Sequence, residues 1–424
     1  MTRLLFKRYL ITVEPVAVLV PLIAIGMGVA VWVLAGRLGG EAPGSPVPAT
    51  RAEATAADAA AADATAADAA AADAAPEPAP PLRLTFLGDI MAHRVNFAME
   101  DFDRIYADIR EELRADDLTF ANLETPVVPS HPYETYPRFN VKPPYLRAAV
   151  EAGIEVFSAA NNHASDRGVD GVHATRRAFA SVDAGEAVYA NGLRESEGST
   201  FRATSMAVRG TRIGFLAVAQ VLNDPEAGDE LVHLVDYRER EAADRLVRWV
   251  ADHAANYDVF VLSYHGGREY ALEPDPRKTR FFERLVRAGV DVVWSHHPHV
   301  VQPWRHLERA DGSRALVLHS TGNLISGQTW GLGPEDARSA RAHTGDSALF
   351  RVKVSFDGGS PRVSHEPILI TNYLDPEHGM VVRRLDGLIA EDIGPQWKLY
   401  YVVRRNALRE IVWRSTAVRV AVLD

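Results

Sequence analysis

The chain has no cysteine among its 424 residues. This absence excludes disulfide bonds, thiolate nucleophiles and metal sites built on cysteine sulfur. It also excludes a lipoprotein anchor, which is attached through a cysteine. Any bound metal must therefore be held by oxygen and imidazole nitrogen, a ligand set that suits Mn, Fe, Zn or Mg.

Clusters of basic residues are missing as well. The chain carries 46 Lys and Arg against 56 Asp and Glu, which gives a formal net charge of -10. No stretch concentrates Lys and Arg on the scale needed to neutralise many phosphates, so we expect no nucleic-acid partner. With 47% hydrophobic and 24% charged residues, the composition is that of a folded protein with a sizeable core.

One long stretch, residues 15–36, contains no charged residue. A helix of this length reaches about 33 Å, which is enough to cross a bilayer. Arg3, Lys7 and Arg8 precede it and, by the positive-inside rule, keep residues 1–14 in the cytoplasm. A cleaved signal peptide is the alternative, but the apolar run exceeds the roughly 7–15 residues usual for one. We therefore predict a single-pass protein of the cell membrane whose C-terminal domain is extracytoplasmic.

Residues 37–81 have the composition of a linker. They are rich in Ala, Pro and Asp, and the unit TAADAAAADA occurs at 55–64 and again at 65–74. The segment has no apolar stripe and no large side chain to pack, so we expect an acidic spacer. We place the folded domain at 82–375 and a C-terminal extension at 376–424. We expect the stretch from about Trp397 to form a closing strand and helix that pack on the domain, or an interface segment.

Short β-rich runs alternate with amphipathic helical stretches through this domain. Such alternation is typical of a layered α/β fold. Two later runs, at 349–358 and 362–370, predict an antiparallel hairpin, so we expect mixed sheets. The predicted strands are 82–88, 118–122, 154–160, 212–219, 258–264, 291–296 and 315–320, and the predicted helices are 101–114, 170–183, 236–256 and 277–288.

Polar side chains that can bind metal follow the predicted strands at their carboxyl ends. In open α/β sheets, loops at the carboxyl ends of strands converge on a ligand site. Positions that are distant in the sequence can therefore meet in space. The residues placed in this way are Asp89, Glu124, Asn162, His163, His265, His297 and His299.

The strongest local signal is the run His296-His297-Pro298-His299. Two imidazoles at i and i+2, with a third adjacent, can face one point where a strand leads into a loop. Neutral imidazole is the commonest metal ligand in proteins. Chance surface histidines are the alternative, but the position directly after an apolar strand favours a metal site.

A second polar cluster, Asn161-Asn162-His163, follows the predicted strand 154–160. Buried polar groups need partners, and a metal ion with an anionic substrate would supply them. Asp166 lies three residues beyond His163. It could orient that imidazole, cap the next helix or bind metal directly.

Several cations lie beside these motifs in an otherwise acidic protein. Arg138, Lys142, Arg167 and Arg268 could clamp an anionic substrate. The alternative is that they are ordinary surface charges.

Six ordered motifs, taken together, resemble those of the CapA family of capsule-biosynthesis proteins, which is linked to poly-γ-glutamate. They are Gly-Asp-x-Met, Asn-Leu-Glu-Thr-Pro, Ala-Asn-Asn-His-x-x-Asp-x-Gly, His-x-Gly-x-Glu-Tyr, His-His-Pro-His-Val-Val-Gln-Pro and Ser-x-Gly-Asn, and they span Leu82 to Ile325. That family is similar in turn to calcineurin-like metallophosphoesterases, which implies a four-layered α/β/β/α sandwich. The resemblance also implies that one or two divalent ions bind, with His163 as an acid or phosphate contact. The implied metal positions are Asp89, Glu124, Asn162, His265, His297 and His299.

The chain departs from the family patterns at several positions. Met91 stands where the phosphoesterase Asp-x-His motif has its histidine, and Glu124 alone represents the Gly-Asp-x-x-Asp motif. We therefore expect one of two metal positions to be weakened or lost. His93 could substitute for the missing histidine, or could lie on the surface at a helix start. Departures from the CapA pattern in the expected pocket wall are Gly267, Ser295, His319, Thr321 and Leu324.

Two functions fit these residues. The first is a metal-dependent hydrolase of a phosphoester, in which His163 protonates the leaving group with Asp166 beside it. The second is a non-catalytic, membrane-tethered partner of capsule-synthase membrane proteins that binds and guides an anionic polymer. Cleavage or transfer at an amide bond of the polymer would use the same groups, and the sequence leaves these alternatives open.

Overall fold

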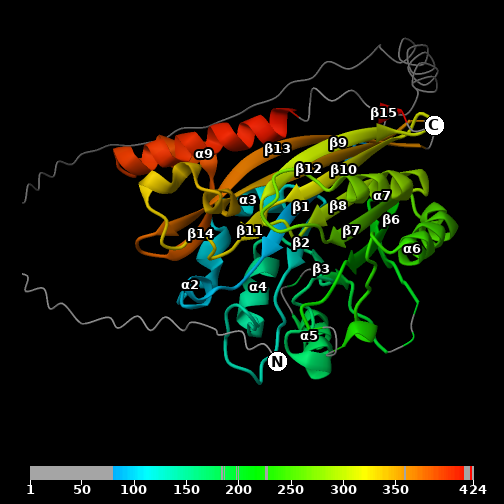
Figure 1. Ribbon diagram of the computed structural model, residues 1–424, viewed down its shortest axis with the longest axis horizontal. Helices are drawn as coiled ribbons and strands as arrows, with labels where there is room; N and C mark the ends of the chain where they lie inside the picture. The colour runs from blue at the N-terminus through cyan, green and yellow to red at the C-terminus, as the bar shows by residue number, and fades with distance from the viewer. Residues whose placement is uncertain are drawn as a thin grey trace, which may run out of the picture. The chain divides into compact units, whose positions relative to one another are not determined.

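A computed structural model describes residues 80–422, apart from residues 183, 184, 186, 197, 199, 225–227, 358, 359 and 415–420. The predicted cytoplasmic segment and transmembrane helix, and the predicted linker up to residue 79, lie outside the described residues. Among the helices that are described, none is long and apolar enough to cross a membrane. The described residues form a mixed α/β fold built on a large sheet (Figure 1).

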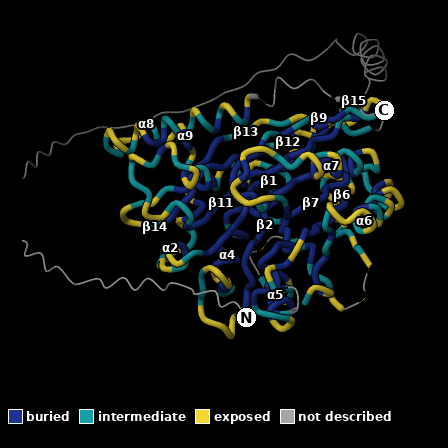
Figure 2. Tube along the Cα trace, in the orientation of Figure 1, coloured by how far each residue is buried: buried dark blue, intermediate teal, exposed yellow. Residues whose placement is uncertain are grey.

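Apolar residues, many of them β-branched or aromatic, dominate the central strands, as expected for strands that are buried on both faces. Figure 2 shows this burial at the centre of the fold, with exposed residues gathered on the outer helices and loops. The strands are β1 (Leu82–Ile90), β2 (Leu118–Leu123), β3 (Val156–Ser158), β4 (Tyr189–Asn191), β5 (Thr204–Val208), β6 (Thr211–Ala219), β7 (Val259–His265), β8 (Val292–His296), β9 (Val301–Glu308), β10 (Arg314–Thr321), β11 (Asn323–Ile325), β12 (Asp346–Asp357), β13 (Ser360–Asp375), β14 (Gly379–Arg384) and β15 (Ala421–Val422).

The hydrogen-bonded path through the sheet runs β4-β3-β2-β1-β12-β13-β10-β8-β7-β6-β5. Strands β1 to β4 are parallel to one another, and so are β6, β7, β8 and β10. The hairpin β12–β13 is antiparallel and lies between these two parallel sets. The sheet is therefore mixed, with two parallel sets whose strands end in loops.

Helices cover the sheet. The α-helices are α2 (Arg94–Phe97), α3 (Arg110–Arg114), α4 (Pro143–Glu151), α5 (Gly168–Ser181), α6 (Arg240–His253), α7 (Pro276–Arg287), α8 (Leu385–Ala390) and α9 (Pro395–Arg414), and the 3₁₀ helices are η1 (Phe102–Tyr106), η3 (Asp229–Leu231), η4 (Ala254–Asn256), η5 (Pro334–Arg338) and η6 (Arg341–Gly345). In Figure 1, α4 and α5 lie below the first parallel set, α6 and α7 lie beside the second, and α9 runs along the top.

The two parallel sets pack against each other through aromatic side chains. Phe86 of β1 lies 5.8 Å from Trp294 of β8, and Phe120 of β2 lies 5.6 Å from Phe215 of β6, between ring centroids. The Trp294 indole also donates a hydrogen bond of 2.8 Å to the Leu87 carbonyl. Two further hydrophobic clusters lie outside this central one, the first including residues of α3 and α4 and the second residues of α6 and α7.

The seven predicted strands are all present, and the predicted antiparallel hairpin is confirmed as β12 and β13. The predicted helix 170–183 corresponds to α5, and the predicted helix 277–288 to α7. The described part of the C-terminal extension contains β14, α8, α9 and the short strand β15; β14 pairs with β13, and β15 pairs with β9. This agrees with a closing helix and strand that pack on the domain.

Two predicted helices differ from the structure. The stretch 101–114 forms η1 and α3 instead of one helix, and the tighter 3₁₀ turn brings both Ile105 and Tyr106 into the core. The stretch 236–256 becomes helical only at Arg240, because the Asp236 carboxylate accepts the backbone N–H of Arg238 and closes a turn there.

Candidate metal centre

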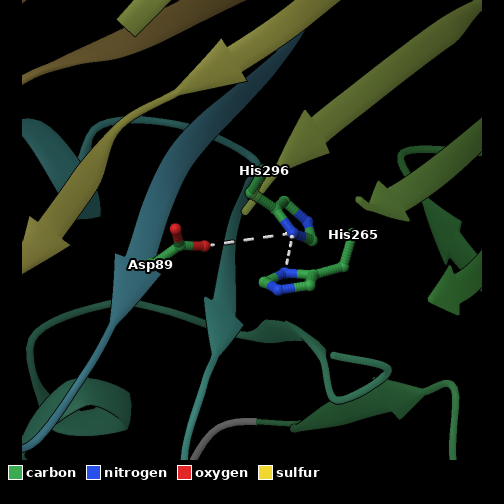
Figure 3. A group of neighbouring side chains, drawn as sticks. All are labelled: Asp89, His265 and His296. Carbon is green, nitrogen blue, oxygen red and sulfur yellow. Dashed lines mark hydrogen bonds and ion pairs between the residues drawn. The ribbon is translucent and has the colours of Figure 1, made fainter. Parts of the chain in front are cut away.

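Carboxyl ends of strands from both parallel sets meet at one place in the fold. Asp89 lies in β1, Glu124 follows β2, and His265 and His296 end β7 and β8. Figure 3 shows Asp89 facing His296, with His265 next to it. The His296 Nδ1 atom lies 3.9 Å from Asp89 Oδ1 and 2.9 Å from His265 Nδ1. Side chains that are far apart in the sequence are therefore brought into direct contact.

The described residues contain overlapping groups that could hold a metal ion. In each group, one ligand atom per residue lies within 4.8 Å of the others. The groups share members, so they form one connected cluster of two carboxylates and four imidazoles. They are Asp89 with His265 and His296, Glu124 with His265 and His297, and Asp89 with Glu124 and His299.

Three histidines of the cluster, His265, His296 and His297, have lowered pKa values. Burial, followed by the charges of neighbouring imidazoles, lowers the pKa of His265 well below its ordinary value. Burial also lowers the pKa of His296 to about 4 and that of His297 to about 3. Because the Nδ1 atoms of His265 and His296 are only 2.9 Å apart, at most one of them carries a proton. Unprotonated imidazole nitrogen is the form that binds metal.

The two carboxylates are fully buried and only partly bonded. Burial raises the pKa of Glu124 well above its ordinary value, and the Asp89 charge raises it further. Burial would also raise the pKa of Asp89, but the imidazoles of His299, whose Nδ1 lies 3.3 Å from Asp89 Oδ2, and of His296 bring it below its ordinary value. Among the described residues, Asp89 Oδ2 and Glu124 Oε1 have no hydrogen-bond partner. A divalent ion fits this donor set because it would supply the partner that both oxygens lack.

Amide side chains orient the cluster. Asn122 donates to Asp89 Oδ1 at 2.8 Å, and Asn162 Oδ1 lies 2.7 Å from His265 Nε2. Asn323 Oδ1 lies 3.0 Å from His299 Nδ1, while the amide nitrogen of Asn323 donates to Gln328 Oε1 and to the Thr344 carbonyl, both at 2.9 Å. With its amide oxygen facing His299, Asn323 accepts the Nδ1 proton and leaves Nε2 free as a ligand atom.

Reasoning from the sequence missed three residues of this site. Asn122 and Asn323 were not singled out, although each lies inside a quoted motif, two residues before Glu124 and at the end of Ser-x-Gly-Asn. His296 was treated only as a neighbour of His297. Its place as the last residue of a buried strand was the available signal.

The turn that carries His297 and His299 has an unusual backbone. Both residues adopt positive φ values, 98° and 58°. Residues other than glycine rarely occupy this region, at a cost of order 1–3 kcal/mol each, and such residues cluster at functional sites. The cost is concentrated where two candidate ligands point into the cluster.

His163 and Asp166 form a buried pair beside the cluster. Asp166 Oδ2 lies 2.7 Å from His163 Nδ1 and also accepts the backbone N–H of Phe139 at 2.7 Å. The cap position of α5 belongs to Arg167, without a capping side chain. Of the three roles considered for Asp166, orientation of His163 is therefore the one that matches the observed contacts.

The two positions in question at the end of β1 are both close to the cluster. Met91 is buried, and its thioether sulfur is a soft ligand that does not suit a hard cation. His93 caps α2, and its Nδ1 accepts the Gly327 N–H at 3.1 Å. Burial and then the charges of His299 and His163 lower the pKa of His93 to about 4. Among the described residues, no candidate metal group includes His93.

The candidate substrate cations have different surroundings. Arg138 donates from Nε and Nη2 to the Asp166 carbonyl at 2.9 and 2.7 Å, so it lies beside His163. Lys142 lies over the ring of Tyr133, with Nζ 5.7 Å from the ring centre.

Among the described residues, the other two arginines form no hydrogen bond or ion pair with the cluster. Arg167 is held by the Glu134 carboxylate and the Phe139 carbonyl. Arg268 is exposed and lines a separate hollow of about 370 Å³ together with Lys278 and Gln302. The geometry therefore favours Arg138 over Arg268 as a group that could reach a substrate at His163.

Comparison with known proteins places this arrangement in context. A family model described as bacterial capsule synthesis protein PGA_cap matches residues 83–328. The chain is 26% identical over 296 residues to the capsule biosynthesis protein CapA of Bacillus anthracis, covering 66% of this chain and 69% of that one. It is also 26% identical over 283 residues to the PGA biosynthesis protein CapA of Bacillus subtilis (strain 168), covering 65% and 69%.

Solved structures are similar at lower identity. A hypothetical protein from Thermus thermophilus shares 20% identity with this chain, with a TM-score of 0.40. The match covers 68% of this chain and all of that protein.

Proposed function

The chain belongs to the bacterial capsule synthesis protein family, and we propose that it is a membrane-anchored protein of capsule or poly-γ-glutamate biosynthesis with a metal-dependent phosphoesterase-type hydrolase site. Its substrate is an anionic polymer or phosphoester, and its partners are membrane proteins of the capsule synthase. The residues before β1 supply the anchor. The orientation, with the domain outside the cell, is testable by proteolysis of intact cells.

The fold is consistent with such a site. We infer that the two parallel sets, packed through Phe86, Phe120, Phe215 and Trp294, are the inner layers of an α/β/β/α sandwich of the metallophosphoesterase type. The helices beside each set form the outer layers. This arrangement brings the carboxyl ends of both sets to one edge, where loops can build a shared site.

One observation carries the proposal of a metal. Asp89 Oδ2 and Glu124 Oε1 are buried without a hydrogen-bond partner, although an unpaired buried carboxylate is strongly unfavourable. Four imidazoles surround them, and burial lowers the pKa of three of these, His265, His296 and His297. One or two divalent ions among Mn, Fe, Zn and Mg suit this oxygen and nitrogen set.

The roles of the residues follow from their contacts. Asp89, Glu124, Asn162 and the imidazoles of His265, His296, His297 and His299 would hold the ion. When bound, a divalent ion supplies Lewis-acid polarisation of a phosphoryl oxygen. His163 gives a proton to the leaving group from Nε2, because Asp166 engages its Nδ1. Arg138, anchored on the Asp166 carbonyl, places positive charge next to that imidazole.

The test compares two histidines in the purified full-length protein. His299→Ala should remove a ligand and lower metal content, whereas His163→Asn should keep the metal and reduce turnover of a phosphodiester by about 10²–10⁴-fold, the usual contribution of a general acid. Metal content is measured by mass spectrometry and turnover with a chromogenic phosphoester.

The outcomes separate the two functions. Metal binding without hydrolysis of any phosphomonoester or phosphodiester, together with normal polymer export in both variants, would contradict a metal-dependent role in capsule synthesis. Loss of export in both variants, without detectable hydrolysis by the wild type, would favour a non-catalytic polyanion-binding role.

A further inference from the structure

A hollow of about 600 Å³ lies beside the His163 side of the candidate metal centre. Its lining includes two arginines and three aromatic residues, and none of its residues belongs to the metal cluster. The arginines are Arg94 and Arg138, the aromatic residues are Phe97, Tyr133 and Tyr136, and Glu134 is the acidic residue of the lining. We call it the Arg94 hollow.

A single aromatic ring separates the Arg94 hollow from the catalytic candidate. The ring of Phe139 lies 4.6 Å from that of His163, 5.2 Å from that of His93 and 6.5 Å from that of Tyr136, between centroids. Tyr136 lines the hollow, whereas Phe139 is fully buried. A ligand that fills the hollow therefore lies within reach of a group bound at His163.

The charge of the hollow is positive, in contrast to the net charge of -10 of the chain. Arg94 is exposed, and in the described part of the chain its guanidinium forms no hydrogen bond or ion pair. The side chain of Arg138 is 55% exposed and lies 3.9 Å from its nearest carboxylate, Asp224. Glu134, the one acid in the lining, is already paired with Arg167. The Arg94 guanidinium is thus available to an anion, and Arg138 adds positive charge beside it although its Nε and Nη2 atoms already donate to the Asp166 carbonyl.

The apolar part of the hollow suits a chain with methylene groups between its charges. Tyr136 is 69% exposed, which is unusual for so large a ring. Tyr133 stacks on Phe97 with centroids 5.5 Å apart, and Lys142 adds a third cation over the Tyr133 ring. Exposed aromatic faces beside arginines bind extended ligands through both their apolar and their charged parts.

We propose that the Arg94 hollow binds a second anionic group of the substrate, one or more units along a polyanionic chain from the group that lies at the metal centre. The inference rests on the proposed function and narrows it. The substrate is an extended polyanion, because a small phosphomonoester carries its charge on one group and has no second anionic group to place on Arg94. Arg94 is a binding residue in this scheme, and Arg138 connects the hollow to His163 through the Asp166 carbonyl.

The experiment measures binding of a glutamate oligomer of about ten units to the full-length protein by calorimetry, with glutamate dimer, polyphosphate and neutral dextran as comparison ligands. Arg94→Gln should weaken binding of the oligomer about 10-fold, the usual size for one charge-assisted hydrogen bond. It should change binding of the dimer far less. Arg94→Lys should restore part of the affinity, because it keeps the charge but not the two-pronged geometry.

Arg287→Gln is the matched control. Arg287 is an exposed arginine at the end of α7, which covers the other parallel set, so this change should leave oligomer affinity as in the wild type. Polyphosphate binding that depends on Arg94 more strongly than oligomer binding does would identify a phosphate-rich chain as the occupant. Equal affinity of wild type, Arg94→Gln and the Arg94→Gln/Arg138→Gln double variant for every polyanion, or dextran binding as tight as oligomer binding, would overturn the proposal.

Failure of this inference and failure of the hydrolase proposal give different results. If oligomer binding depends on Arg94 but the protein has no hydrolytic activity, binding at the Arg94 hollow is supported and the hydrolase proposal is contradicted. Hydrolysis of small phosphodiesters, with polyanion binding that is indifferent to Arg94, does the reverse.

Discussion

Buried charge is handled in two opposite ways in this molecule. Asp346 and Arg404 are 2% and 1% exposed, and they pair directly, with Nε 3.1 Å from Oδ2. The guanidinium also donates to the Ala337 carbonyl at 2.9 Å and lies 2.8 Å from His343 Nδ1. Asp89 and Glu124 are equally buried, but within the described residues neither forms an ion pair with a lysine or arginine, and each has an unbonded oxygen. The first site is closed, and the second is open toward a ligand.

The difference teaches how to separate structural from functional charge. Burial raises the pKa of Asp346 to about 6 even beside Arg404, so desolvation acts on both sites. Only the pair on α9 and β12 has a complete set of protein partners. A buried acid whose remaining neighbours are imidazoles and amides, with no lysine or arginine, has its full set of partners only when a cation is added.

The two regions are also connected. The Thr344 carbonyl, two residues before Asp346, accepts from the Asn323 amide, which in turn contacts His299. The Arg404 pair therefore supports the segment that orients one candidate ligand. The C-terminal helix α9 takes part in this support although it lies beyond the residues that the family model matches.

The largest effect is expected from breaking the closed site. Arg404→Met leaves the Asp346 carboxylate buried without its cation, so the free energy of unfolding should fall by about 3–5 kcal/mol. Urea denaturation measures it. Arg405→Met is the control, because Arg405 pairs with the 60%-exposed side chain of Asp386, and its loss should cost at most ~1 kcal/mol. Similar losses in the two variants would contradict the contrast drawn between the sites.

The matching test of the metal cluster is the variant Glu124→Gln. Without metal, this variant should be at least as stable as the wild type, because it removes a buried acid that has no partner for one oxygen. With metal at 100 times its dissociation constant, the wild type should gain ~2.7 kcal/mol and the variant much less. Thermal unfolding with chelator and with added metal measures both. A metal-free loss as large as that of Arg404→Met would show that Glu124 is structural.

The smallest expected effect is the pH dependence of stability caused by Lys278, a third buried charge. It is fully buried, donates to the Gly266 and His319 carbonyls at 2.8 and 3.1 Å, and has its pKa lowered to about 7, chiefly by burial. Between pH 7 and the ordinary lysine value, the unfolded chain holds more protons than the folded one. Stability of the wild type should therefore rise with pH in this window, by up to ~1.4 kcal/mol per unit.

Lys278→Met has no such proton to lose. The free energy of unfolding of the variant should lack this slope when both proteins are measured in urea at pH 7, 8 and 9. If the free energy of unfolding changed with pH in the same way in both proteins, the lowered pKa of Lys278 would be contradicted. Other titrating groups cancel in the difference, because they are present in both chains.

The sequence allowed much of the fold to be predicted, because buried strands and the polar residues after them leave a clear pattern. The run from His296 to His299 indicated a site by itself. Arg404 and Asp346 could not be paired in advance, since they are 58 positions apart in the chain and lie on different elements. The burial of Lys278 could not be predicted either, since lysine is almost never fully buried. The transmembrane helix and the metal stay predictions.

The hydrogen bond from Trp294 to Leu87 joins residues 207 positions apart in the chain, and the metal cluster spans the same interval. A chain that stopped before β7 would hold Asp89 and Glu124 but none of the four imidazoles. The cluster thus exists only in a completed chain whose two halves have met, and contacts of such sequence separation form slowly. An ion that needs ligands from both halves is captured late in folding, so its uptake marks the arrival of the native state.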